Sequence, residues 1–119
     1  MTIFCVDDSS TIRMLVKKAV ESEGYSVLEA ENGKQALAHK DISKADIFLV
    51  DVNMPEMNGF EFVKNIKKDP NLKTKPVIFL TTESAVDKKN EGKDAGGSGW
   101  IIKPFEPPAL IKVLKMFSE

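Results

Sequence analysis

Short runs of apolar residues recur along the chain and suit buried strands. Five runs are rich in β-branched or aromatic side chains, and apolar and polar positions alternate only weakly within them. Such runs are typical of strands buried on both faces of a sheet. They predict strands over residues 3–6, 26–30, 47–50, 77–80 and 100–102.

The segments between these runs have the spacing of amphipathic helices, with apolar residues three and four positions apart. Gly24 marks the end of the first helix, and Pro107-Pro108 suits the start of the last, because the first turn leaves its N–H groups unpaired. The pattern predicts helices over residues 12–20, 36–37, 62–66, 84–95 and 110–117.

The segment 84–95 has the weakest helical pattern. Its interior, 87–94, has no apolar side chain, and Gly92 costs a helix about 1 kcal/mol relative to alanine. We expect this helix to be held mainly by tertiary contacts of Val86 and Ala95, and to be easily loosened.

Strict alternation of strands and helices predicts an α/β fold, with a parallel sheet covered by helices on both faces. In such sheets, ligands bind at the carboxyl ends of the strands, where the strand order reverses. The residues that follow each predicted strand are therefore the first place to look for chemistry.

Composition limits the possible functions. The 119 residues, 42% of them hydrophobic and 29% charged, suit one globular domain over 1–119. A net charge of −1 gives no attraction to nucleic acid or anionic lipid. The single cysteine, Cys5, suits a reducing compartment, and no signal peptide or membrane-length run is evident, so we expect a cytoplasmic protein. With His39 as the sole histidine, expected on the surface, a zinc site has too few ligands.

Four of the five predicted strands end in polar residues that could share one site. These residues are Asp7-Asp8, Asp51, Thr81-Thr82 and Lys103-Pro104; Glu29-Ala30-Glu31, after the second strand, receives no role. Three carboxylates close together repel one another and need a cation or protons. Oxygen ligands favour Mg²⁺. A cation, a lysine and a hydroxyl around a carboxylate suit phosphoryl transfer, with an aspartyl phosphate as product.

Four motifs carry a family resemblance over the whole chain. The segments VDDSS (6–10), DVNMPEMNG (51–59), PVIFLTTE (76–83) and GWIIKPF (99–105) resemble the receiver domain of two-component response regulators, especially the single-domain chemotaxis (CheY-like) type. The resemblance implies a doubly wound, flavodoxin-like sheet of five parallel strands in the order 2-1-3-4-5, with five helices.

The resemblance also implies a role for each strand-end residue. Asp51 would accept a phosphoryl group from a histidine kinase. Asp8 would bind Mg²⁺ directly, Asp7 mainly through water, and Asn53 through its main-chain carbonyl. Thr81 would hydrogen-bond the phosphoryl group and Lys103 would pair with it. The Lys103–Pro104 bond is commonly cis in this family.

Other positions would modulate the switch. Trp100 occupies the aromatic switch position, where tyrosine or phenylalanine is more common. Thr82 replaces a small residue beside the phosphoryl site. Asn53 and Glu83 form the pair found in chemotaxis-type receivers, so we expect rapid self-dephosphorylation. The face formed by the fourth helix, fifth strand and fifth helix would bind a downstream protein, although the polar fourth helix departs from a motor-binding face.

We therefore predict a monomeric, phosphorylation-dependent signalling switch that is not a turnover enzyme. Three alternatives remain at this stage. The chain could be a phosphate sink that drains a kinase, a small Mg²⁺-dependent phosphatase with an aspartyl intermediate, or a pseudo-receiver that never takes phosphate. The phosphatase would need a substrate-binding cap, and the intact acidic, threonine and lysine positions argue against the pseudo-receiver.

Overall fold

The computed structural model describes residues 1–82 and 89–117, in which strands and helices alternate as the sequence predicts. The elements are β1 (Thr2–Val6), α1 (Ser10–Ser22), β2 (Ser26–Ala30), α2 (Gly33–Ala38), the 3₁₀-helix η1 (Ile42–Lys44), β3 (Ile47–Asp51), α3 (Gly59–Lys67), β4 (Val77–Thr82), α4 (Lys89–Ala95), β5 (Gly99–Lys103) and α5 (Pro107–Met116).

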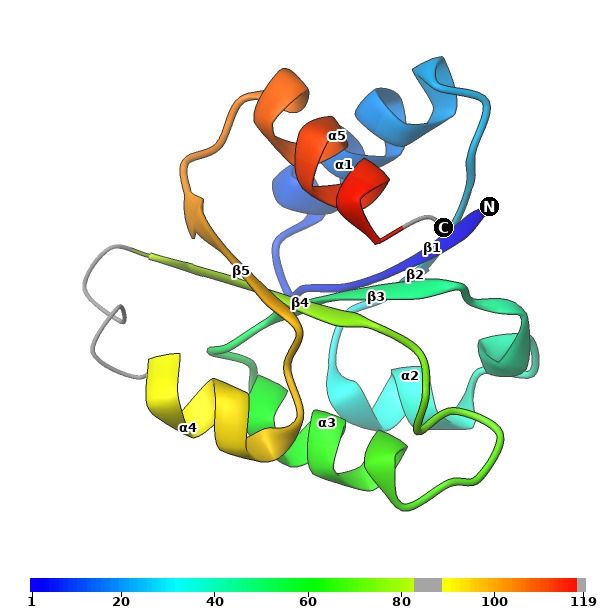
Figure 1. Ribbon diagram of the computed structural model, residues 1–119, viewed down its shortest axis with the longest axis vertical. Helices are drawn as coiled ribbons and strands as arrows, with labels where there is room; N and C mark the ends of the chain where they lie inside the picture. Colours follow the sequence, from blue (N-terminus) through cyan, green and yellow to red (C-terminus); the bar gives the residue numbers. More distant parts are fainter. Residues whose placement is uncertain (83–88, 118–119) are drawn as a thin grey trace.

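The strands form one parallel sheet between two layers of helices (Figure 1). The order is β2-β1-β3-β4-β5, which confirms the doubly wound, flavodoxin-like fold. Helices α1 and α5 cover one face and α2, α3 and α4 cover the other. The chain leaves β1 toward one face and β3 toward the other, so the strand order reverses between the carboxyl ends of these two neighbours.

Alternate residues of the strands fill two separate cores. Phe4, Phe48 and Phe79 point into the core beneath α2, α3 and α4. Ile3, Leu49 and their neighbours in register point into the core beneath α1 and α5. Every residue of β3 is buried, so the prediction of strands covered on both faces is confirmed there. Cys5 is a free, fully buried thiol in this interior.

Local signals fix the ends of several helices. The Ser9 side chain accepts from the Ile12 N–H and begins α1. Asn58 and Glu61 form a reciprocal capping box that begins α3. Gly24 has a φ of 82°, a conformation that glycine adopts readily after a helix. The caps at Ser9 and Asn58 fix the loops that follow β1 and β3, whereas Gly24 lies at the opposite edge of the sheet, before β2.

Most elements extend a few residues beyond the predicted bounds, and several differences concern the site or the fold. The last two strands are longer than predicted, because the polar residues Thr81, Thr82 and Lys103 continue the ladder. The helix expected over 84–95 is seen over Lys89–Ala95, and residues 84–88, including Val86, lie outside the described residues. The 3₁₀-helix η1 was not predicted. Within the described residues, no helix has the length and apolar character needed to cross a membrane.

Candidate phosphoacceptor site

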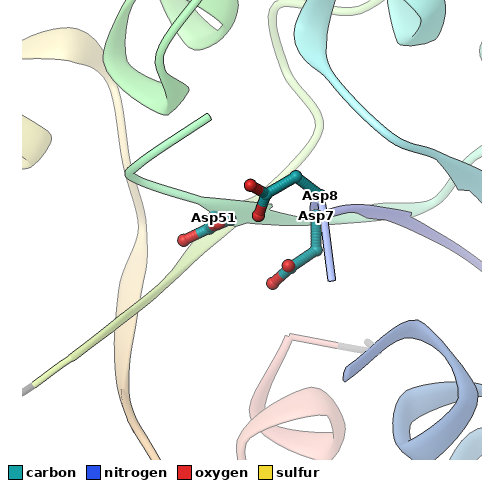
Figure 2. A group of neighbouring side chains, drawn as sticks. All are labelled: Asp7, Asp8 and Asp51. Carbon is teal, nitrogen blue, oxygen red and sulfur yellow. The ribbon is translucent and has the colours of Figure 1, made fainter. Parts of the chain in front are cut away.

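Three carboxylates meet where β1 and β3 end (Figure 2). Asp7 and Asp8 follow β1, and Asp51 is the last residue of β3. Each residue offers a carboxylate oxygen, and the three oxygens lie within 4.8 Å of one another. Asp7 is fully buried, Asp51 is 5% exposed, and Asp8 is exposed. The group, called the acidic pocket below, therefore has two buried carboxylates and one that is exposed to solvent.

Lys103 brings a positive charge into this pocket from the end of β5. Its Nζ donates to Asp7 Oδ2 at 2.7 Å and lies 3.3 Å from Asp51 Oδ1. Burial alone would lower the pKa of Lys103, but the hydrogen bond to Asp7 and the charges of Asp51 and Asp7 outweigh it and raise the pKa. One ammonium thus faces three carboxylates, and the pocket keeps an excess of negative charge.

This excess of charge perturbs Asp51. Burial, followed by the negative charge of Asp7, raises the pKa of Asp51 to about 7, against the opposing effects of Lys103 and of the Asn53 N–H. The Asn53 N–H donates to Asp51 Oδ1 at 3.3 Å. A buried carboxylate whose ionised form is disfavoured by its neighbours is typical of a functional site.

The start of α3 packs closely behind Asp51. A Cβ atom on Gly59 would lie 2.3 Å from the Asp51 carbonyl oxygen and 3.0 Å from the Val52 Cα. The Gly59 N–H also donates to the Val52 carbonyl at 2.9 Å. Glycine at position 59 therefore allows the helix to pack against the loop that follows Asp51 at a distance that no other residue permits.

Thr81 and Lys103 reach the same edge through the register of the sheet. Asp51 pairs with Leu80, so Thr81 stands one residue further along the neighbouring strand, and Thr82 pairs with Lys103. The Thr81 hydroxyl oxygen is buried, and among the described residues it has no hydrogen-bond partner. An orphaned buried hydroxyl is costly, and a ligand at the strand ends would satisfy it.

The other residues singled out from the sequence lie around this edge. The Lys103–Pro104 bond is cis. Thr82 is exposed at the end of β4, and Glu83 lies outside the described residues. Trp100 is half-buried on β5, with its ring 5.8 Å from that of Phe79. Its Nε1 is buried without a hydrogen-bond partner in the described part of the chain.

The donor set fits a magnesium ion. Carboxylate oxygens from three side chains are the ligands that a hard divalent cation prefers, and the negative charge that Lys103 leaves uncompensated would stabilise it. Asp8 at the mouth is open to a hydrated ion, whereas Asp7 is held by Lys103 and by the Ser9 N–H at 2.8 Å. The pocket thus has the chemistry to bind a cation and a phosphoryl group side by side.

Sequence reasoning missed one side chain beside the pocket. Arg13, in the first turn of α1, donates from Nη1 to the Asp7 carbonyl oxygen at 2.6 Å, and its Nε lies 3.3 Å from Glu29 Oε1. The helical pattern marks position 13 only as polar. Its signal in the sequence is that Arg13 is the sole arginine.

Comparison with known proteins identifies the family of this chain. The response regulator receiver domain family matches residues 3–115. The chemotaxis protein CheY1 of Helicobacter pylori is 40% identical over 98% of this chain and 95% of its own length. The chemotaxis protein CheY-3 of Vibrio cholerae is 37% identical over 100% of this chain and 92% of its own.

A solved structure of a chemotaxis response regulator is also similar to this chain. The structure of the V. cholerae chemotaxis response regulator CheY4 superposes with a TM-score of 0.91 at 42% identity, covering 98% of this chain and 97% of CheY4. Receiver domains bind Mg²⁺ in an acidic pocket, and the cluster of Asp7, Asp8 and Asp51 fits such an ion. The chain therefore belongs to the response regulator receiver domain family, and it is a receiver of the chemotaxis CheY type.

Proposed function

We propose that this chain is a phosphorylation-dependent switch in chemotaxis-type two-component signalling, and that Asp51 accepts a phosphoryl group from a phosphohistidine of a histidine kinase. The observation that carries the proposal is the meeting of three carboxylates with Lys103 at the ends of β1, β3 and β5. The receiver family membership supports the same reaction.

In the proposed transfer, a carboxylate oxygen of Asp51 attacks the phosphorus atom of the phosphohistidine. The phosphorus–nitrogen bond breaks, and its electron pair returns to the imidazole ring. The product is an aspartyl phosphate. When bound, Mg²⁺ supplies positive charge that offsets the repulsion among the carboxylates and among the phosphoryl oxygens.

The residues of the chain orient and neutralise the transferred group. Lys103, already within 3.3 Å of Asp51 Oδ1, would pair with a phosphoryl oxygen. The unpartnered Thr81 hydroxyl would donate to another. The Asn53 N–H, on Asp51 Oδ1, holds the nucleophile in place, and the Asn53 main-chain carbonyl would serve as a further metal ligand. Such preorganised charges and donors contribute most of the catalysis in phosphoryl transfer.

Return to the resting state is hydrolysis of the acyl phosphate. A water oxygen attacks phosphorus in line with the aspartyl oxygen, the phosphorus–oxygen bond breaks, and Asp51 regains its carboxylate while inorganic phosphate leaves. Asn53 and Glu83 would assist this water, and Thr82, exposed beside the site, would limit its approach. We therefore propose a single receiver domain over 1–119 that promotes its own phosphorylation and dephosphorylation and is not a turnover enzyme.

The output face in this proposal is formed by α4, β5 and α5. Ile102 on β5 is 40% exposed, which is unusual for a large apolar side chain in a strand. A cavity of about 360 Å³ is lined by residues of β4, α4 and β5 that include Phe79, Lys89, Lys93 and Trp100. Phosphorylation would draw Thr81 toward the phosphoryl group, shift Trp100 and α4, and change the affinity of this face for a protein target. We propose that the chain acts as a cytoplasmic monomer.

The direct test is phosphorylation of the purified protein by a small phosphodonor such as acetyl phosphate. With Mg²⁺ present, intact mass spectrometry should show the gain of one phosphoryl group, and the gain should be absent with a chelator and in Asp51→Asn. Asp69→Asn is the matched control, because Asp69 caps a turn before β4, at the other end of the sheet. A wild-type protein that never gains the mass, or an Asp51→Asn protein that still does, would contradict the proposal.

A further inference from the structure

Arg13 ties the acidic pocket to β2. The Arg13 side chain is 14% exposed, and its guanidinium makes two contacts with different elements. Nη1 donates to the main-chain carbonyl of Asp7 at 2.6 Å, and Nε pairs with the Glu29 carboxylate at 3.3 Å. Glu29 pairs with Cys5 in the register of β1 and β2, so the ion pair lies beside the end of β1.

The contact with Asp7 fixes a peptide unit of the metal site. The Asp7 N–H donates to the Ala30 carbonyl at 3.1 Å, and its carboxylate accepts from Ser9 N–H and Lys103. The main-chain carbonyl is the remaining polar group of Asp7, and it accepts a hydrogen bond from Arg13. That carbonyl belongs to the peptide unit joining Asp7 to Asp8, and its orientation sets the direction in which the exposed Asp8 side chain leaves the backbone.

The chemistry of arginine suits this role better than that of lysine. The chain has 17 basic residues, and Arg13 is its only arginine. A guanidinium donates from several nitrogens in one rigid plane, so it can hold a carbonyl and a carboxylate at once, whereas an ammonium is a single point charge. Glu29 also balances the charge of Arg13, so the contact adds no net positive charge that would repel a divalent cation.

We propose that Arg13, held by Glu29, is a positioning residue that orients Asp8 as a ligand for the divalent cation of the phosphoacceptor site. This inference rests on the proposed function. It also gives a role to the acidic end of β2, where Glu29 otherwise has no part in the reaction.

The test measures Mg²⁺ affinity directly, without phosphorylation. The amide chemical shifts of Asp8 and Asn53 are followed by NMR as MgCl₂ is added to the full-length wild type and variants. Loss of a group that orients a metal ligand commonly costs at least about tenfold in affinity. We expect Arg13→Ala to raise the Kd for Mg²⁺ about tenfold and Arg13→Lys to give an intermediate value.

The control is Lys44→Ala, which also removes one positive charge and one ion pair. Lys44 pairs with Asp41 at 3.2 Å, is 72% exposed, and belongs to η1, before β3 begins. The Kd of Lys44→Ala for Mg²⁺ should equal that of the wild type. Glu29→Gln should weaken Mg²⁺ binding in the wild-type background and have no effect when combined with Arg13→Ala, because the two residues act through one contact.

Phosphorylation kinetics with acetyl phosphate distinguish a role of Arg13 in orienting Asp8 from a role in stabilising the fold. In Arg13→Ala, the Mg²⁺ concentration giving half the maximal phosphorylation rate should rise, while the rate at saturating Mg²⁺ should stay near that of the wild type. If Arg13 only stabilises the fold, urea denaturation of Arg13→Ala and Arg13→Lys will show lower stability with an unchanged Kd, and the inference is overturned. If the wild type binds no Mg²⁺ and takes no phosphoryl group, the proposed function itself fails.

Discussion

Replacement of Asp51 by asparagine should stabilise the protein in the absence of metal. Asp51 and Asp7 are both buried and share the ammonium of Lys103, so ionised Asp51 is held against a like charge. Asparagine keeps the shape of the side chain and removes the charge. The Asp51→Asn variant, which we expect to abolish phosphorylation, should therefore unfold at higher urea concentrations than the wild type at neutral pH.

The size of the effect follows from the pKa of Asp51, which rises from 3.8 to about 7 on folding. A tenfold change in proton affinity is worth about 1.4 kcal/mol, so the upper limit is about 4 kcal/mol. Water entering at the exposed Asp8 should relax part of this repulsion, and we expect about 2 kcal/mol.

The upward direction of the Asp51 pKa shift fixes the pH range over which stability changes. Below pH 4, Asp51 is protonated in both the folded and unfolded states, and the penalty is absent. Between pH 4 and about 7, the unfolded state has lost the proton that the folded state retains, so this group makes the stability of the wild type fall as pH rises. Above about 7 the penalty is constant. Asp51→Asn lacks the Asp51 contribution to this slope.

The assay is urea denaturation followed by far-UV circular dichroism, from pH 4 to 8 with a chelator present. The gap between Asp51→Asn and the wild type should be small at pH 4 and reach about 2 kcal/mol above pH 7. Asp69→Asn should show no such gap. Saturating Mg²⁺ should stabilise the wild type and narrow the difference. Equal stability of Asp51→Asn and the wild type at pH 7.5 without metal would refute the claim that the carboxylates repel in the folded protein.

Three further outcomes are expected. Glu56 has a φ of 68°, which is strained for a residue other than glycine or asparagine, so Glu56→Asn should raise the free energy of unfolding by about 0.5–1 kcal/mol in urea denaturation. Gly59→Ala places a Cβ 2.3 Å from the Asp51 carbonyl and should lower the free energy of unfolding by about 3 kcal/mol in the same assay; a loss below about 1 kcal/mol would show that the loop moves freely. The phosphoryl group should be lost rapidly with Mg²⁺ present and persist after chelation, as followed by intact mass, whereas a phosphoprotein stable for hours in Mg²⁺ would contradict this.

The place of the site was predictable because it depends on topology. Alternation of strands and helices makes the sheet parallel, and parallel strands bring their carboxyl ends to one edge. Asp7, Asp51 and Lys103 follow three different strands, so the sequence pattern brings them to the same edge. Which strands are neighbours came from the family resemblance, because the apolar runs are too alike to specify an order.

Contacts made by single side chains were less predictable. Arg13 and Glu29 meet only because β2 lies beside β1, and no pattern in either segment predicts this contact. His39 was expected on the surface but is half-buried, edge-on to Phe4 with 5.1 Å between ring centroids, and its Nδ1 accepts from the Asp41 N–H. The chain folds back after α2 and carries the ring onto the core, which the polar neighbours of His39 do not reveal.

The central claim is that the side chain at position 51 becomes the acyl phosphate, and chemical trapping tests it most directly. The protein is phosphorylated with acetyl phosphate and Mg²⁺ and reduced with borohydride, which converts an aspartyl phosphate to homoserine. It is then digested for peptide mass mapping. The account predicts homoserine at position 51 and aspartate at positions 7, 8 and 69. Homoserine at any of those positions, or unmodified aspartate at 51 in a protein that gained the phosphoryl mass, would contradict it.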